Sequence, residues 1–181
     1  MNLRLAGIAC VAALCFAFGS SAKEIPIGEP QVKEGLRVAA VYLQPVEIDQ
    51  PSLMRDPKDS DLHFEADVTA VKGNPWGLEE GTWFPGLAIH YKISRVDDGK
   101  SVEGNLTPDI ASDGFAYCNN IKLPGSGAGK YKVVLTLYPP SAKSWNIARH
   151  VDKENATAEW FKPFSTEYEF VFAGTGKKGA Y

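Results

Sequence analysis

The stretch DSDLHFEADV, residues 59–68, alternates polar and apolar side chains almost without interruption. A period of two predicts a β-strand with one face in a core and the other face toward water. The side chains expected to face water are the polar ones, Asp59, Asp61, His63, Glu65 and Asp67. Those expected to face the core are the apolar ones, Leu62, Phe64, Ala66 and Val68. This strand predicts a β fold, and its acidic face around one of only three histidines needs an explanation.

Similar strand-like runs recur along the chain, separated by turns rich in glycine, proline and aspartate. Asp98-Gly99 suits a hairpin turn, and residues 153–161 could supply one helical turn. About seven short strands predict an all-β fold, a single-domain antiparallel β-sandwich of the immunoglobulin-like type. The expected strands are residues 35–48, 62–71, 86–96, 131–139 and 166–174, with shorter ones near 100–106 and 116–123.

The beginning of the chain has the pattern of a cleaved secretory signal peptide, residues 1–22. Arg4 precedes an apolar run, and small residues precede Lys23. The folded domain would then span 23–172, followed by a flexible C-terminal tail, 173–181. Two of the three cysteines would leave with the signal, so Cys118 would have no partner for an internal disulfide.

The charge balance limits the possible partners. Removing the signal takes the formal charge from −3 to −4, because Arg4 is the only charged residue before Lys23. A mildly acidic exported chain without a basic patch argues against nucleic-acid partners and is compatible with binding cations.

Enzyme motifs are absent from the sequence. It has no Gly-x-Ser-x-Gly elbow, no His-Glu-x-x-His pair, no phosphate loop and no dinucleotide fingerprint. The chain is therefore not expected to be an enzyme. The acidic strand alone permits two interpretations, a solvated face or part of a metal site. A metal site would need further ligands from elsewhere, and His150, in a polar stretch between two tryptophans, is one candidate.

Eight segments occur in the order and rough spacing of one family, and together the chain resembles the periplasmic iron-transport proteins that bacteria place beside an inner-membrane iron permease. The similarity runs from about residue 24 to 172. The segments are EIPIGEP (24–30), VAAVYLQPVEI (38–48), DLHFEADV (61–68), GTWFPGL (81–87), ASDG (111–114), YPPS (138–141), RHVD (149–152) and WFKPF (160–164).

The resemblance implies a periplasmic homodimer with an immunoglobulin-like fold and a metal site close to the dimer interface. Family members bind copper there and handle iron, sometimes manganese or zinc. Their function is iron acquisition together with the permease and associated periplasmic proteins. The family ligands that correspond to residues of this chain are His63, Glu65 and His150.

Two further family ligands are replaced in this chain. Asp109 stands at the position of a methionine and Ala116 at that of a second histidine. Carboxylate in place of thioether makes the site harder, so Fe(II), Mn(II) and Zn(II) become as suitable as Cu(II). Cys118 shares a face with position 116 in an extended strand and could restore a soft ligand. Met54, in a loop before His63, is a more distant source of sulfur.

Two other functions remain open at this point. The chain could be a metal-independent dimeric interaction module of the same fold whose ligand set has degenerated. It could also be a carbohydrate-binding sandwich that stacks sugars on tryptophans, although two of the four, Trp83 and Trp160, lie inside the family-like segments.

Overall fold

In the computed structural model, residues 24–125, 127–141 and 147–175 are described, and they form antiparallel strands linked by turns and two short 3-10 helices. The predicted signal peptide and the last six residues of the predicted tail lie outside them. The helices are η1 (Pro51–Leu53) and η2 (Pro57–Asp59). The strands are β1 (Ile25–Pro26), β2 (Gln31–Lys33), β3 (Leu36–Leu43), β4 (Leu62–Ala70), β5 (Ala88–Arg95), β6 (Ser101–Ala111), β7 (Gly114–Ile121), β8 (Gly129–Tyr138) and β9 (Phe164–Phe172).

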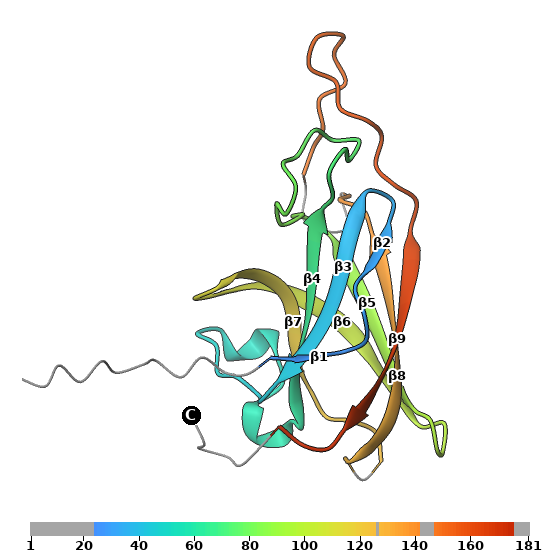
Figure 1. Cartoon of the computed structure of the whole chain (residues 1–181). Coiled ribbons are helices and arrows are strands. Elements are labelled where there is room, and N and C mark those ends of the chain that lie inside the picture. The colour runs from blue at the N-terminus through green and yellow to red at the C-terminus, as the bar shows by residue number, and fades with distance from the viewer. Residues whose placement is uncertain (1–23, 126, 142–146, 176–181) are drawn as a thin grey trace, which may run out of the picture.

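The strands follow the order β1-β3-β4-β7-β6-β5-β8-β9, with β2 also paired to β3. The long strand β6 joins two layers: its first half pairs with β5 up to Leu106, and its second half pairs with β7 from Thr107 onward. The sheet therefore curls over itself, and β3, β4 and β7 face β5, β8 and β9 across a common core (Figure 1). The predicted all-β antiparallel sandwich is confirmed.

The core has the alternation that the sequence predicts for β4. Leu62, Phe64, Ala66 and Val68 are all fully buried and lie in the main hydrophobic cluster. Facing side chains of β8 complete the pattern from the other layer, and each large apolar side chain buried this way contributes about 1.5–3 kcal/mol. The apolar face of β4 thus orients the strand and sets which side chains point out of the sandwich.

The gap between the two layers at β9 is closed by side chains. Tyr168 donates its hydroxyl to the Val38 carbonyl at 3.0 Å, Gln31 Nε2 donates to the Glu167 carbonyl at 2.6 Å, and Lys33 Nζ donates to the Ser165 carbonyl at 2.7 Å. The bonds from Gln31 and Lys33 occupy carbonyls that β9, an edge strand, would otherwise leave open to pairing with another chain.

Both local predictions from turn chemistry have a counterpart in the structure. Gly99 has φ +69° in the β5–β6 hairpin, as expected for an Asp-Gly turn. Residues 152–156 form a single turn, in which the Ala156 amide donates to the Asp152 carbonyl four residues earlier, at 3.0 Å. The described part of the chain has no helix long enough to cross a membrane.

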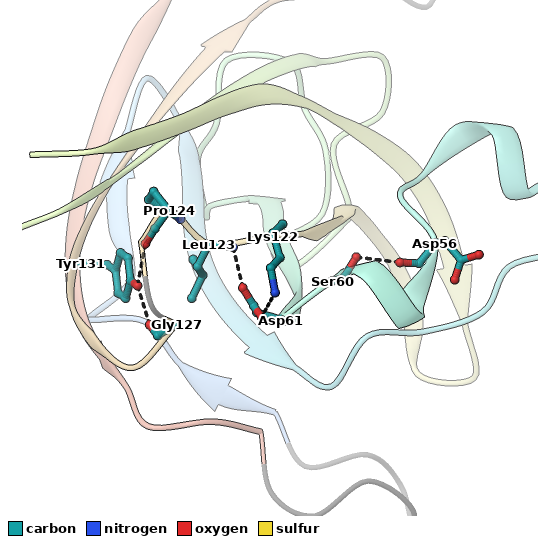
Figure 2. A network of polar contacts seen from close by, with 8 residues as sticks. All are labelled: Asp56, Ser60, Asp61, Lys122, Leu123, Pro124, Gly127 and Tyr131. Atoms are coloured by element: carbon teal, nitrogen blue, oxygen red, sulfur yellow. Dashed lines mark hydrogen bonds and ion pairs between the residues drawn. The ribbon is translucent and has the colours of Figure 1, made fainter.

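The beginning of β4 is anchored by the polar residues in front of it (Figure 2). Asp61 accepts hydrogen bonds from the Leu123 amide at 2.9 Å and from Lys122 Nζ at 2.7 Å, both just after β7. Ser60 donates its hydroxyl to the Asp56 carbonyl at 2.9 Å, at the second 3-10 helix. Asp61 therefore serves the framework, because it ties the start of β4 to the end of β7 and so stabilises the register that places His63.

Candidate metal centre

The register of three neighbouring strands gathers the predicted ligands on one face. His63 lies opposite Asn120, and Glu65 lies opposite Cys118, across β4 and β7. On the next strand, Asp109 of β6 is two positions beyond Thr107, the residue that faces Cys118. Residues opposite each other or two positions apart share a sheet face, so these side chains all point out of the sandwich core on the same side.

The donor atoms of three predicted ligands converge. One ligand atom each from His63, Asp109 and Cys118 lie within 4.8 Å of one another. Glu65 adds a carboxylate, with its Oε1 3.3 Å from His63 Nε2. Metal–ligand bonds of about 2.0–2.3 Å separate tetrahedral donors by about 3.3–3.8 Å, so small side-chain rotations would close the set around one ion.

This face is not the solvated face that the alternation predicts. His63 is 1% exposed and Cys118 is fully buried, so the expectation of a water-facing histidine was wrong. Segment 44–57, which contains the first 3-10 helix and leads into the second, covers the start of β4 on the same side as the β6–β7 hairpin (Figure 1). Alternation reports which side chains leave the sandwich core, but it cannot report that another segment folds back over them.

His63, Glu65 and Asp109 line a cavity of about 420 Å³ between that segment and the β6–β7 hairpin. An adjoining cavity of about 280 Å³ shares Glu24, Glu65, Asp109 and Asp113 and adds Asp67. The larger one is lined by Glu24, Leu43, Val46, Glu47, Ile48, His63, Glu65, Asp109, Ile110, Ala111, Ser112 and Asp113. The lining is therefore strongly acidic, although only His63, Glu65 and Asp109 of it were predicted as ligands.

The carboxylates around these cavities disturb one another. Burial raises the pKa of Asp67, and the charge of Glu65 raises it further. Arg37 lowers this pKa, and the charge of Asp113 raises it by less than Arg37 lowers it. Burial also raises the pKa of Glu24, followed by Glu65, Asp67 and Asp113. The anionic form of the cluster is thus disfavoured by itself, and a bound cation would relieve the repulsion.

Cys118 is a thiol in this environment. Burial raises its pKa well above the usual range for cysteine, and the nearby carboxylates of Asp109, Glu65 and Asp67 raise it further. Its Sγ lies 3.6 Å from the Thr107 carbonyl. Only a cation placed at the sulfur would favour the thiolate here, because a metal ion reverses the local electrostatics.

His150 is not brought to this cluster within one chain. It is exposed, and its Nδ1 lies 3.5 Å from Asp152 Oδ2. The segment 147–163 projects beyond the end of the sandwich opposite to the start of β4 (Figure 1). If His150 is a ligand of this site, it must come from a second copy of the chain.

Ala116, Met54 and the third histidine of the chain, His90, contribute no donor to the converging group. Ala116 faces Asp109 across the hairpin and lines the smaller acidic cavity, where its methyl group offers no donor. Met54 is buried and lines a separate cavity of about 330 Å³ with Asn120 and Val46. His90 lies on β5 in the other layer, outside the converging group.

Sequence reasoning missed three residues of the site. Glu24 and Asp113 line both acidic cavities, and Asn120 lies 2.9 Å from His63 Nδ1 through its Oδ1. Asp113 lies inside the family-like segment ASDG, which was a usable signal. Asn120 is two residues beyond Cys118 on the same strand, so its parity could have placed it on the site's face.

The chain is an antiparallel β-sandwich in which imidazole, carboxylate and sulfur donors converge beside an acidic cavity. This combination defines its class, the β-sandwich proteins with a candidate transition-metal centre. Residues 21–174 match the family of Fe2+ transport proteins, and the chain belongs to this family. The family resemblance predicted from eight short segments is thereby confirmed.

Relatives of similar length and solved structures agree with this assignment. The chain is 50% identical over 179 residues to a UPF0423 protein of Brucella abortus, covering 98% of this chain and 97% of that one. Copper-reconstituted P19 of Campylobacter jejuni has a TM-score of 0.81 and 38% identity, covering 86% of this chain and 99% of that one. FetP of uropathogenic Escherichia coli strain F11 has a TM-score of 0.78 and 41% identity, covering 84% and 97%.

Proposed function

We propose that this protein is a periplasmic metal-binding component of a bacterial iron-uptake system. It would bind a first-row transition-metal cation and support its passage through an inner-membrane iron permease. The observation that carries the proposal is the convergence of His63, Asp109 and Cys118 donor atoms within 4.8 Å, with Glu65 beside His63. Such a set of nitrogen, oxygen and sulfur donors is ordinary for transition metals and unusual for Mg²⁺ or Ca²⁺.

The ligand set favours particular cations. Solved relatives include copper-bound forms of P19 and FetP, which supports copper as one cargo. Two carboxylates and an imidazole suit Fe(II), Mn(II) and Zn(II), whereas the sulfur of Cys118 adds preference for copper and zinc. The acidic lining would attract any of these cations to the cavity and would repel anions.

A homodimer with the metal centre near its interface is part of the proposal. An apolar cavity of about 450 Å³ adjoins the centre and shares Asp109 with it. Ile110 and Phe115, which also line it, are 67% and 54% exposed at the β6–β7 hairpin. Exposed apolar surface of this kind is typical of protein interfaces, and a second copy seated there could bring its own His150 to the centre.

Metal binding can be tested directly on protein purified after export. Titration with Cu(II), Fe(II), Mn(II) and Zn(II) should show tight binding of at least one cation to the wild type. His63→Ala should weaken that binding by at least about 100-fold, since even outer-shell partners of metal ligands are worth about 10–100-fold.

His90→Ala is the matched control, because this histidine lies in the other layer, and it should bind as the wild type does. Equal affinities of wild type and His63→Ala for all four cations would disprove the metal centre. A dimer that persists in that case would favour the metal-independent interaction module. That alternative is supported by the exposed apolar side chains of the β6–β7 hairpin and by Ala116, which offers no metal donor.

The acidic residues that line the cavity should favour cation binding and lower the stability of the metal-free protein. Because burial, and after it the neighbouring carboxylate of Glu65, raises the pKa of Asp67, its ionised form costs folding free energy at neutral pH. Asp67→Asn should stabilise the metal-free protein by about 0.5–1 kcal/mol, which corresponds to a rise in Tm of roughly 1–4 °C. The same change should weaken cation binding several-fold, by on the order of 1 kcal/mol.

Thermal unfolding and cation titration of the same preparations measure both effects. Glu80→Gln removes an exposed charge from the loop between β4 and β5 and should change neither quantity. A lower Tm for Asp67→Asn, or unchanged affinity, would show that this carboxylate is not part of an electrostatic trap.

A further inference from the structure

Asn120 is a buried amide whose every polar contact is accounted for. It is 2% exposed on β7, and its Nδ2 donates to the carbonyls of Val46 and Arg55 at 2.8 and 2.9 Å. Its Oδ1 accepts from the Val46 amide at 3.1 Å and lies 2.9 Å from His63 Nδ1. One side chain thus contacts both the covering segment 44–57 and the histidine of the metal centre.

These contacts allow only one orientation of the amide. A flipped side chain would direct its NH₂ group at the Val46 amide and its oxygen at two carbonyls, which would replace hydrogen bonds by repulsive contacts. The oxygen therefore faces His63, and an oxygen without hydrogen can only accept. The ring nitrogen opposite it, Nδ1, must carry the proton of the neutral imidazole.

We infer that Asn120 is the positioning residue of the metal centre: it selects the Nδ1–H tautomer of His63 and directs the Nε2 lone pair into the cavity. Nε2 is the atom that lies 3.3 Å from Glu65 Oε1, in the cavity that Asp109 also lines. In this tautomer the neutral ring cannot donate to Glu65, so two lone pairs face each other. A cation between them would satisfy both, in keeping with the outer-shell partners that orient metal-bound histidines.

The same amide links the ligand to the segment that covers it. Val46 lines the cavity that holds His63, and both its backbone groups bond Asn120. Arg55, at the far end of the segment, is held through its carbonyl. Loss of Asn120 would therefore remove two things at once, the choice of tautomer and the attachment of the cover, and variants can separate them.

Long-range ¹H–¹⁵N spectra of the labelled, metal-free protein distinguish the two neutral tautomers of each of the three histidines. Wild type should show His63 as a single Nδ1–H tautomer, and a Nε2–H tautomer there would overturn the inference. This measurement needs no metal, so it stands even if the proposed function fails. The effect on affinity rests on the proposed function and is measured by titration with Zn(II).

Asn120→Ala should give a mixture of tautomers and weaken Zn(II) binding by about 10–100-fold. Asn120→Asp keeps an oxygen for His63 but loses both amide donors, so it should be less stable and still hold the Nδ1–H tautomer. Asn119→Ala is the control, because this neighbouring side chain bonds the Asn105 carbonyl and not the centre. A single Nδ1–H tautomer with unchanged Zn(II) affinity in Asn120→Ala would show that Asn120 only holds the cover.

Discussion

Replacing Cys118 with serine should abolish the sulfur-to-metal absorption of the Co(II)-loaded protein. The expectation follows from the geometry, since Cys118 Sγ is one of three donor atoms within 4.8 Å of one another. Co(II) takes the tetrahedral sites that Zn(II) takes and does not oxidise a thiol, and a bound thiolate gives it an intense near-ultraviolet charge-transfer band. Serine keeps nearly the same shape but supplies no sulfur, so the band should vanish entirely.

In an anaerobic titration of the wild type, the charge-transfer band should stop growing at one equivalent of Co(II) per chain. Cys118→Ser should bind Co(II) at least about tenfold more weakly. Met54→Leu is the sulfur control, because Met54 lines a different cavity and should leave the band unchanged. A wild-type complex that shows only weak visible bands, with the same affinity as Cys118→Ser, would mean that the thiol is a buried structural residue and no ligand.

The result would also explain how this chain departs from its family pattern. The resemblance places a thioether at position 109 and an imidazole at position 116, where this chain has Asp109 and Ala116. The structure sets Cys118 beside the resulting gap, on the strand that also bears Ala116. One thiolate would then replace a lost thioether and a lost imidazole, and together with the carboxylates it should move the preference from copper toward zinc.

The sequence predicts the fold well because the fold depends on local patterns. The alternation of β4 assigns Leu62 and Phe64 to the core, and both are fully buried. The same rule fails for His63, because the cover over it comes from segment 44–57, whose proline-rich sequence has no period to read. Exposure depends on what packs over a face, and that packing is a tertiary property.

The donor residues that converge at the candidate site were predictable from the sequence, but their arrangement was not. Spacing within β4 places Glu65 beside His63, but only the order β3-β4-β7-β6 brings Cys118 opposite Glu65. In that order β4 pairs with β7, more than 50 residues further along the chain, as the separation of 57 positions between His63 and Asn120 shows. The positioning amide was missed for the same reason, since its role depends on two backbone segments that approach it from outside the strand.

The position of His150 leads to the second large prediction, that it completes the centre of a partner chain. Within one chain it is exposed on segment 147–163, at the end of the sandwich opposite to the start of β4 (Figure 1). Val151 beside it is 73% exposed, which adds apolar surface to a segment that already projects into solvent. In a twofold dimer each copy would give its segment to the other and receive one in return.

Mixing two defective variants tests this arrangement as an all-or-none effect. His63→Ala and His150→Ala should each lose tight cation binding when purified alone. If the ligands come from different chains, a mixture that exchanges subunits freely should regain about one tight site per four chains, because half the dimers unite an intact His63 with an intact His150. Cation titration of the re-equilibrated mixture measures this number.

The double variant mixed with wild type is the control, since its mixed dimers contain no intact pair and add no sites. No recovery in the mixture of single variants, with dimers present and subunit exchange shown, would mean that His150 acts within its own chain or does not bind the metal.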